Sequence, residues 1–169
     1  MYASILTACQ FLLFLSGVAA FAPSSGASNV RAHSTKLDAE KIAKDVSGEE
    51  LEVMLQEWEQ PLVLDAYATW CGPCLLMAPH FEEAAQELEG KVRFVKMDTD
   101  KEPEMANRLN IMGLPTLMYL DQLTPEDSDE PGDAKAVLKD KIEGALTKES
   151  IVDLCNFHFF GGPRPTALS

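Results

Sequence analysis

Two cysteines, Cys71 and Cys74, lie within the segment Trp70-Cys71-Gly72-Pro73-Cys74, where an apolar strand-like run gives way to a helical pattern. Residues at positions i and i+3 of a helical turn face the same way, so the two sulfurs can form a small-ring disulfide. The first thiol would sit at the helix N-terminus, where unpaired N–H groups and the helix dipole favour its thiolate. The second would lie one turn deeper and be shielded. The spacing therefore predicts thiol–disulfide exchange, with Cys71 as the nucleophile.

A zinc site and a purely structural disulfide are the two alternatives for this pair. A tetrahedral zinc site needs two further ligands at suitable spacing. The other cysteines and histidines are scattered along the chain and form no second pair; they are Cys9, Cys155, His33, His80 and His158. We therefore expect no metal, and we expect Cys155 to be a small buried hydrophobe.

Asp65 lies six residues before Cys71 and interrupts the apolar run Leu62 to Tyr67. Burial in such a strand should raise the pKa of its carboxyl group, which would suit a proton shuttle near neutral pH. The alternative is a carboxylate that faces a polar pocket.

Lys96 alternates with core residues and by itself resembles a solvated strand residue. Pro79, inside a helical pattern, should bend that helix.

Strand-like and helix-like segments alternate after residue 37, and they must position these side chains. The expected strands are Lys41 to Val46, Leu62 to Tyr67, Val92 to Met97, Thr116 to Leu120 and Val137 to Ile142. The expected helices are Gly48 to Trp58, Gly72 to Leu88, Pro103 to Leu109 and Thr147 to about Phe159. Trp58 and the methionines are expected in the core. The strand–helix units predict an α/β protein with a parallel sheet core, and the last two strands predict an antiparallel edge.

The motifs DAYATWCGPCLLMAPHFEEAA, VKMDTDKEPEMANRLNIMGLPTL and EGALTKES occur in this order. From about residue 40 to 160 the chain resembles the thioredoxin family, and most of all its plastid y-type members. The resemblance implies the thioredoxin fold, a central mixed sheet of four to five strands flanked by four helices.

The family's site residues carry over where this sequence matches them. The resemblance implies that Cys71 attacks a target disulfide, that Cys74 resolves the mixed disulfide, and that Asp65 assists proton transfer beside Lys96. It also implies a cis-proline at Pro115, a helix kink at Pro79 and a substrate-docking surface; the matching residues of that surface are Trp70, Gly72, Pro73, Gly113, Leu114 and Gly144.

The implied activity is reduction of protein disulfides, with no cofactor and a monomeric chain. The implied partners are ferredoxin–thioredoxin reductase as electron donor and peroxiredoxins or methionine sulfoxide reductases as recipients. Two alternatives are a secretory-pathway disulfide oxidase or isomerase and a non-catalytic docking subunit. Pro73 between the cysteines favours the reductase, because isomerases of this superfamily usually carry His there. The intact cysteine pair and Asp65 weigh against the docking subunit.

The chain has 169 residues and a net charge of −13, and 46% of its residues are hydrophobic. This composition excludes a wholly disordered chain or a polytopic membrane protein, and the acidic charge disfavours nucleic acid as a partner.

Residues 1–36 hold no acid and only two bases, Arg31 and Lys36, so a leader precedes the acidic domain. Residues 1–20 resemble a signal peptide, and an uncleaved membrane anchor is the alternative.

Residues 21–36 have the composition of a transit peptide, and the junction AAFAPS resembles the bipartite presequence of algae with secondary plastids. The resemblance implies delivery to the plastid stroma, with no membrane association of the mature protein; the alternative is secretion. We expect the domain at residues 37–160, a disordered tail at 161–169 and an acidic insertion at 121–134. The insertion should project from the end opposite the cysteines, as a solvated loop or as a docking element for a basic partner.

Overall fold

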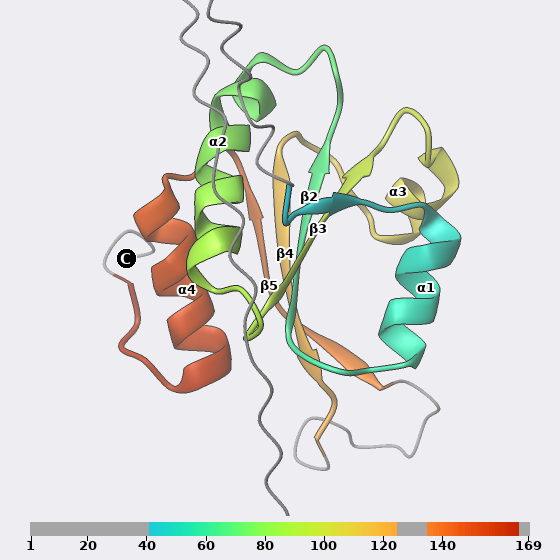
Figure 1. The fold of residues 1–169 in the computed structure, drawn as a ribbon. Helices are drawn as coiled ribbons and strands as arrows, with labels where there is room; N and C mark the ends of the chain where they lie inside the picture. The colour runs from blue at the N-terminus through green and yellow to red at the C-terminus, as the bar shows by residue number, and fades with distance from the viewer. Residues whose placement is uncertain (1–40, 125–134, 166–169) are drawn as a thin grey trace, which may run out of the picture. The chain divides into compact units, whose positions relative to one another are not determined.

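The computed structural model describes residues 41–124 and 135–165. The elements in chain order are β1 (Lys44–Asp45), α1 (Gly48–Gln56), β2 (Leu62–Tyr67), α2 (Gly72–Glu87), β3 (Arg93–Asp98), α3 (Pro103–Arg108), β4 (Thr116–Gln122), β5 (Ala136–Glu143) and α4 (Lys148–Phe160). In Figure 1 the helices lie on the two sides of a central twisted sheet, with α2 and α4 on one side and α1 and α3 on the other. The expected α/β architecture is confirmed.

The five strands form one mixed sheet in the order β1-β3-β2-β4-β5. β3 pairs in parallel with both β1 and β2, whereas β4 is antiparallel to both β2 and β5. β2 is therefore the central strand, and both of its edges are hydrogen-bonded. The carboxyl end of β2 leads directly into the cysteine turn, so the turn begins on the most constrained strand of the sheet.

Alternation along β2 divides the core between the two faces of the sheet. Val63 packs with α2 and α4, in a cluster that includes Phe81 and Ile151. Leu62 and Leu64 point the other way and pack with α1 and α3. Because side chains alternate along a strand, Asp65 shares the face of Val63, the side covered by α2.

The helix ends are set by local side chains. The Ser47 side chain accepts a hydrogen bond from the Glu50 backbone N–H, and the Glu50 carboxylate accepts one from Ser47, which together form a capping box at α1. At α4 the Thr147 side chain accepts a hydrogen bond from the Ser150 backbone N–H, and Gly161 ends that helix in the left-handed conformation, with φ 68°.

Most predicted elements match the observed ones within a few residues, and β2 matches at both ends. The edge strand is shorter than expected, because only Lys44 and Asp45 pair with β3. α1 ends at Gln56 instead of Trp58, since Glu57 leaves the helical conformation. β4 continues to Gln122, so the insertion begins later than the predicted residue 121.

Several predictions concern segments outside the described residues. They are the signal peptide at 1–20, the transit-like segment at 21–36, residues 125–134 of the insertion and the last four residues of the tail. Within the residues that the structure does describe, no helix combines the length and the hydrophobicity needed to cross a membrane.

Candidate active site

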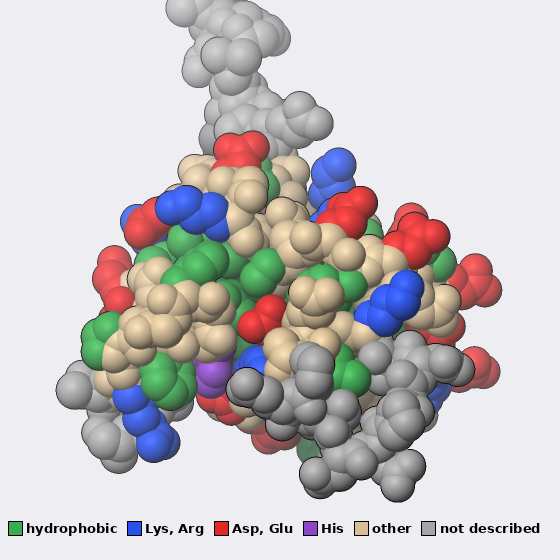
Figure 2. All heavy atoms as spheres, turned by 90° about the horizontal axis from the view of Figure 1, so that it is seen from below, with side chains coloured by type: hydrophobic (Ala, Val, Ile, Leu, Met, Phe, Trp, Pro, Cys, Tyr) green, Lys and Arg blue, Asp and Glu red, His purple; other side chains and the backbone are tan. Residues whose placement is uncertain are grey.

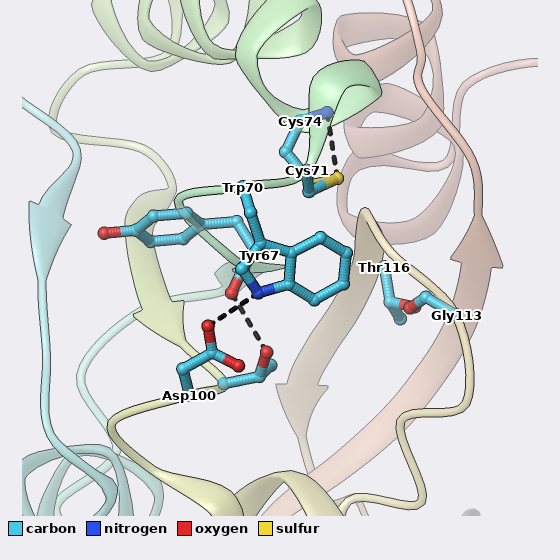
Figure 3. Close-up of a disulfide and its surroundings, with 8 residues drawn as sticks. Tyr67, Trp70, Cys71, Cys74, Asp100, Gly113 and Thr116 are labelled. Carbon is cyan, nitrogen blue, oxygen red and sulfur yellow. Dashed lines mark hydrogen bonds between the residues drawn. A yellow bond between two sulfur atoms is a disulfide. The ribbon is translucent and has the colours of Figure 1, made fainter.

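The predicted cysteine pair lies where β2 turns into α2, and its sulfurs are joined in a disulfide with an S–S distance of 2.06 Å. Cys71 is the N-cap residue of α2, and the backbone N–H of Cys74 donates to its Sγ at 3.2 Å. Figure 3 shows this contact above the loop that follows β2. After reduction, the same N–H group and the positive end of the helix dipole would favour a thiolate at Cys71.

Both cysteines are buried, with exposed fractions of 5% for Cys71 and 4% for Cys74. They pack against Ala68, and the side chains of Tyr67 and Leu114 close the cluster. The exposed fraction of the residue therefore does not distinguish Cys74 from Cys71, and the expectation that Cys74 is the more shielded of the two is wrong by this measure. What separates them is the adjoining groove, which Cys71 lines and Cys74 does not.

This groove has a volume of about 490 Å³ and passes along the disulfide. Two of its side chains are large, apolar and mostly exposed, Trp70 at 71% and Met112 at 80%. Its lining residues are Trp70, Cys71, Gly72, Pro73, Thr99, Ala106, Ile111, Met112, Gly113 and Leu114. An open apolar groove beside a reactive sulfur can hold an extended segment of another protein.

The loop before β4 forms one wall of the groove. The peptide bond between Leu114 and Pro115 is cis, as expected. The Thr116 hydroxyl donates to the Gly113 carbonyl at 2.7 Å, and the Gly144 N–H donates to the Pro115 carbonyl at 2.8 Å. Of the predicted docking residues in this region, Gly113 and Leu114 line the groove. Pro115 and Gly144 do not line it, although Pro115 directly follows Leu114 and is hydrogen-bonded to Gly144.

The turn carrying Trp70 is tied to the loop after β3. Nε1 of Trp70 donates to Oδ2 of Asp100 at 2.7 Å (Figure 3). One residue earlier, the Thr99 N–H and hydroxyl both donate to the Tyr67 carbonyl, at 2.9 and 3.1 Å. These bonds hold the exposed indole at the edge of the groove.

Asp65 is 2% exposed, and within the described part of the chain its Oδ1 has no hydrogen-bond partner. Burial raises the pKa of its carboxyl group from 3.8 to about 7. The Lys96 ammonium opposes this shift and the Asp45 carboxylate adds to it. The predicted burial of Asp65 is confirmed, and with this raised pKa the carboxyl group can take up or release a proton near neutral pH.

Lys96 lies beside Asp65 in the sheet, because the register pairs the two residues directly. Its side chain is only 15% exposed, and its Nζ lies 3.8 Å from Oδ2 of Asp45. Lys96 is therefore more enclosed than its alternation with core residues suggests.

Pro79 lies in a helix and Cys155 is buried, as the sequence predicts. Pro79 lies inside α2, and Cys155 is a free, fully buried thiol whose pKa burial raises to about 12. Among the described residues, no group of three or more His, Cys, Asp or Glu side chains is placed to hold a metal ion.

Sequence reasoning missed Met112, Asp100 and Asp45. It placed all methionines in the core, which is wrong for Met112 because this side chain lines the groove. The position of Met112 just before Gly113-Leu114-Pro115 is the signal that could have found it.

Comparison with known proteins places these features in a family. A sequence model named thioredoxin matches residues 42–154. The chain is 44% identical over 90 residues to the chloroplastic thioredoxin-like protein CITRX of Oryza sativa subsp. indica, covering 53% of this chain and 46% of that protein. It is 34% identical over 110 residues to chloroplastic thioredoxin Y1 of Arabidopsis thaliana, covering 65% and 56%. The chain thus spans about half the length of the curated relatives it matches.

Solved structures agree with this result. Chloroplastic thioredoxin z is 37% identical, with a TM-score of 0.55 over 68% of this chain and 92% of that one. The Trx4 domain of ERdj5, at 23% identity and a TM-score of 0.59 over 69% and 95%, shares the fold. Since the matched residues 42–154 contain all five strands and the disulfide turn, the chain belongs to the thioredoxin family.

Proposed function

We propose that this protein is a thiol–disulfide oxidoreductase that reduces disulfides in other proteins through Cys71 and Cys74. One observation carries the proposal above all. Cys71 caps the N-terminus of α2, is already joined to Cys74, and lines a groove open to a partner. This arrangement brings a stabilised thiolate, a resolving thiol and a docking surface together.

In the first step the Cys71 thiolate attacks one sulfur of the target disulfide. A mixed disulfide forms between Cys71 and that sulfur, and the other target sulfur leaves as a thiolate. The backbone N–H of Cys74, which contacts Sγ of Cys71 at 3.2 Å, stabilises the attacking charge. Trp70, Gly72, Pro73, Gly113 and Leu114 would contact the target segment, because all five line the groove.

In the second step Cys74 resolves the mixed disulfide. Its thiol gives a proton to Asp65, whose carboxyl pKa of about 7 lets it accept one near neutral pH. The Cys74 thiolate then attacks Sγ of Cys71, and the remaining target sulfur leaves as a thiolate. Two electrons have moved to the target, and the Cys71–Cys74 disulfide has formed.

The plastid is the proposed compartment. The relatives named as chloroplastic and the transit-like composition of residues 21–36 support it. Ferredoxin–thioredoxin reductase is the proposed electron donor, and peroxiredoxins or methionine sulfoxide reductases are the proposed targets. A fluorescent fusion tests the targeting: Phe21→Ala should leave it outside the stroma, and unchanged stromal import would contradict the bipartite presequence.

Reduction of insulin disulfides tests the chemistry. Cys71→Ser should abolish it, whereas Cys74→Ser should accumulate mixed disulfides and trap target proteins. Alkylation of the reduced protein should modify Cys71 before Cys74, and the reverse order would contradict the assigned roles. A docking subunit would instead keep its function in a cell-growth test after both cysteines are changed to serine.

A further inference from the structure

Three charged residues lie in one row across the sheet. The register pairs Asp45 of β1 with Lys96 of β3, and Lys96 with Asp65 of β2. Paired residues on neighbouring strands point to the same face of a sheet, so the row reads carboxylate, ammonium, carboxylate. Two strand spacings of about 4.8 Å place the backbones of Asp45 and Asp65 roughly 10 Å apart.

Lys96 is the middle residue of this row, and its ammonium group is held on the Asp45 side. Its Nζ lies 3.8 Å from Oδ2 of Asp45 and 5.7 Å from the centre of the Tyr67 ring. The Tyr67 hydroxyl donates to the other oxygen of Asp45, Oδ1, at 2.8 Å. Asp45 thus engages both groups that flank Asp65 on this side, while Oδ1 of Asp65 accepts no hydrogen bond from the residues described.

We propose that Asp45 is a positioning residue for the proton transfer assigned to Asp65. By holding the Lys96 ammonium away from Asp65, it leaves the buried carboxyl group incompletely neutralised and able to accept the Cys74 proton. The inference rests on the proposed function for its catalytic meaning, but its electrostatic part can be measured without any activity.

The electrostatic directions agree with this geometry. The Lys96 charge lowers the pKa of Asp65 and the Asp45 charge raises it. Removing the Asp45 charge should therefore have two effects on Asp65. It ends the repulsion between the two carboxylates, and it frees the Lys96 ammonium to approach Asp65. Both effects lower the Asp65 pKa.

The titration of other ionisable groups on this side of the sheet must be distinguished from the effect of Asp45 on the Asp65 pKa. From the strands and from the two helices packed there, they include Tyr67, Asp98, Cys71, Cys74, Glu82, Tyr119, Cys155 and His158. Several are already engaged: Asp98 pairs with Lys101 at 3.2 Å, and His158 contacts Asp140 at 3.1 Å. Working with the oxidised protein removes the titration of Cys71 and Cys74.

A direct NMR titration of the Asp65 carboxyl carbon in the oxidised protein tests the proposal. Asp45→Asn should lower the Asp65 pKa by about 0.3 to 1 unit, as expected for a charge roughly 10 Å away in a partly screened setting. Asp45→Glu keeps the charge and should stay near the wild-type value. Glu49→Gln, which removes another exposed acid shortly after β1, is the matched control and should leave the Asp65 pKa unchanged. An unchanged pKa in Asp45→Asn would overturn the proposal.

A double-mutant cycle separates positioning of Lys96 from simple repulsion. Lys96→Met alone should raise the Asp65 pKa. If Asp45 acts through Lys96, the shift caused by Asp45→Asn should shrink by about half or more in the Lys96→Met background. Equal shifts in both backgrounds would overturn the positioning role.

Kinetics then separate this inference from the proposed function. In Asp45→Asn the pH profile of mixed-disulfide resolution should move to lower pH by the same amount as the Asp65 pKa. If the Asp65 pKa moves and the profile does not, the electrostatic role of Asp45 is supported and the catalytic role of Asp65 is overturned.

Discussion

The indole of Trp70 and the carboxylate of Asp100 join the cysteine turn to the loop after β3 through a hydrogen bond of 2.7 Å. Trp70 is 71% exposed, so its contacts within its own turn do little to hold the ring. The bond to Asp100 keeps this large apolar surface at the edge of the groove, where a target would meet it.

Asp100→Ala should therefore weaken the capture of targets without altering the thiol chemistry. We expect kcat/KM for a protein disulfide to fall by about two- to fivefold, in keeping with the loss of one exposed charge-assisted hydrogen bond. The rate with a small disulfide reagent should stay near the wild-type value. An equal loss for both substrates would contradict a docking role for this bond.

Asp65 makes stability depend on pH. Its pKa is about 7 in the folded protein, against 3.8 in an unfolded chain. Below pH 3.8 both states hold the proton and burial carries no ionisation penalty. As pH rises from about 4 through 7 the unfolded state ionises first, so the folded state loses stability, by up to about 4 kcal/mol.

Asp65→Ala should accordingly stabilise the oxidised protein at pH 8 and lose that gain as the pH falls towards 4. Denaturant unfolding at several pH values measures it. A gain that is the same at pH 4 and pH 8 would show that the pKa of Asp65 is not raised by folding.

Met112 supplies the most exposed apolar surface of the groove, at 80%. Met112→Ala should lower kcat/KM for protein targets by about three- to tenfold, because partial burial of this side chain contributes roughly 1 kcal/mol. Leu138→Ala is a matched control, since Leu138 is 45% exposed and pairs with Leu120 near the far end of β4. Equal effects of the two substitutions would argue against Met112 as a contact residue.

The acidic insertion starts and ends away from the disulfide. β4 begins at Thr116 beside the groove wall and runs seven residues, roughly 20 Å, to Gln122. The Leu123 N–H then donates to the carbonyl of Lys135, the residue before β5. Figure 2 shows this opposite end of the molecule, where hydrophobic side chains gather on the α4 side and charged ones lie around the edge and near the centre.

Replacing residues 126–134 with a short Gly-Asn turn should leave the Cys71 pKa and insulin reduction nearly unchanged, since exposed charges beyond about 10 Å are largely screened at ordinary salt. Alkylation rates across pH and the insulin assay measure both. A tenfold loss of activity would mean that the insertion reaches the active site.

The cysteine turn and the elements around it can be predicted from local patterns in the sequence. The run Leu62 to Tyr67 carries its own strand signal, and the helical spacing after Cys74 sets α2, because both depend on the periodicity of neighbouring residues. Asp65 could be recognised because a carboxylate that interrupts a buried strand stands out locally.

The distant residues that join that turn are set by the three-dimensional fold. Asp45 lies in a weak edge strand, and nothing near it in the sequence indicates that it pairs with Lys96 and the Tyr67 hydroxyl. Asp100 reaches Trp70 across 30 residues in the same way. Strand register and loop placement arise from packing between segments far apart in the chain, so local periodicity carries no record of them.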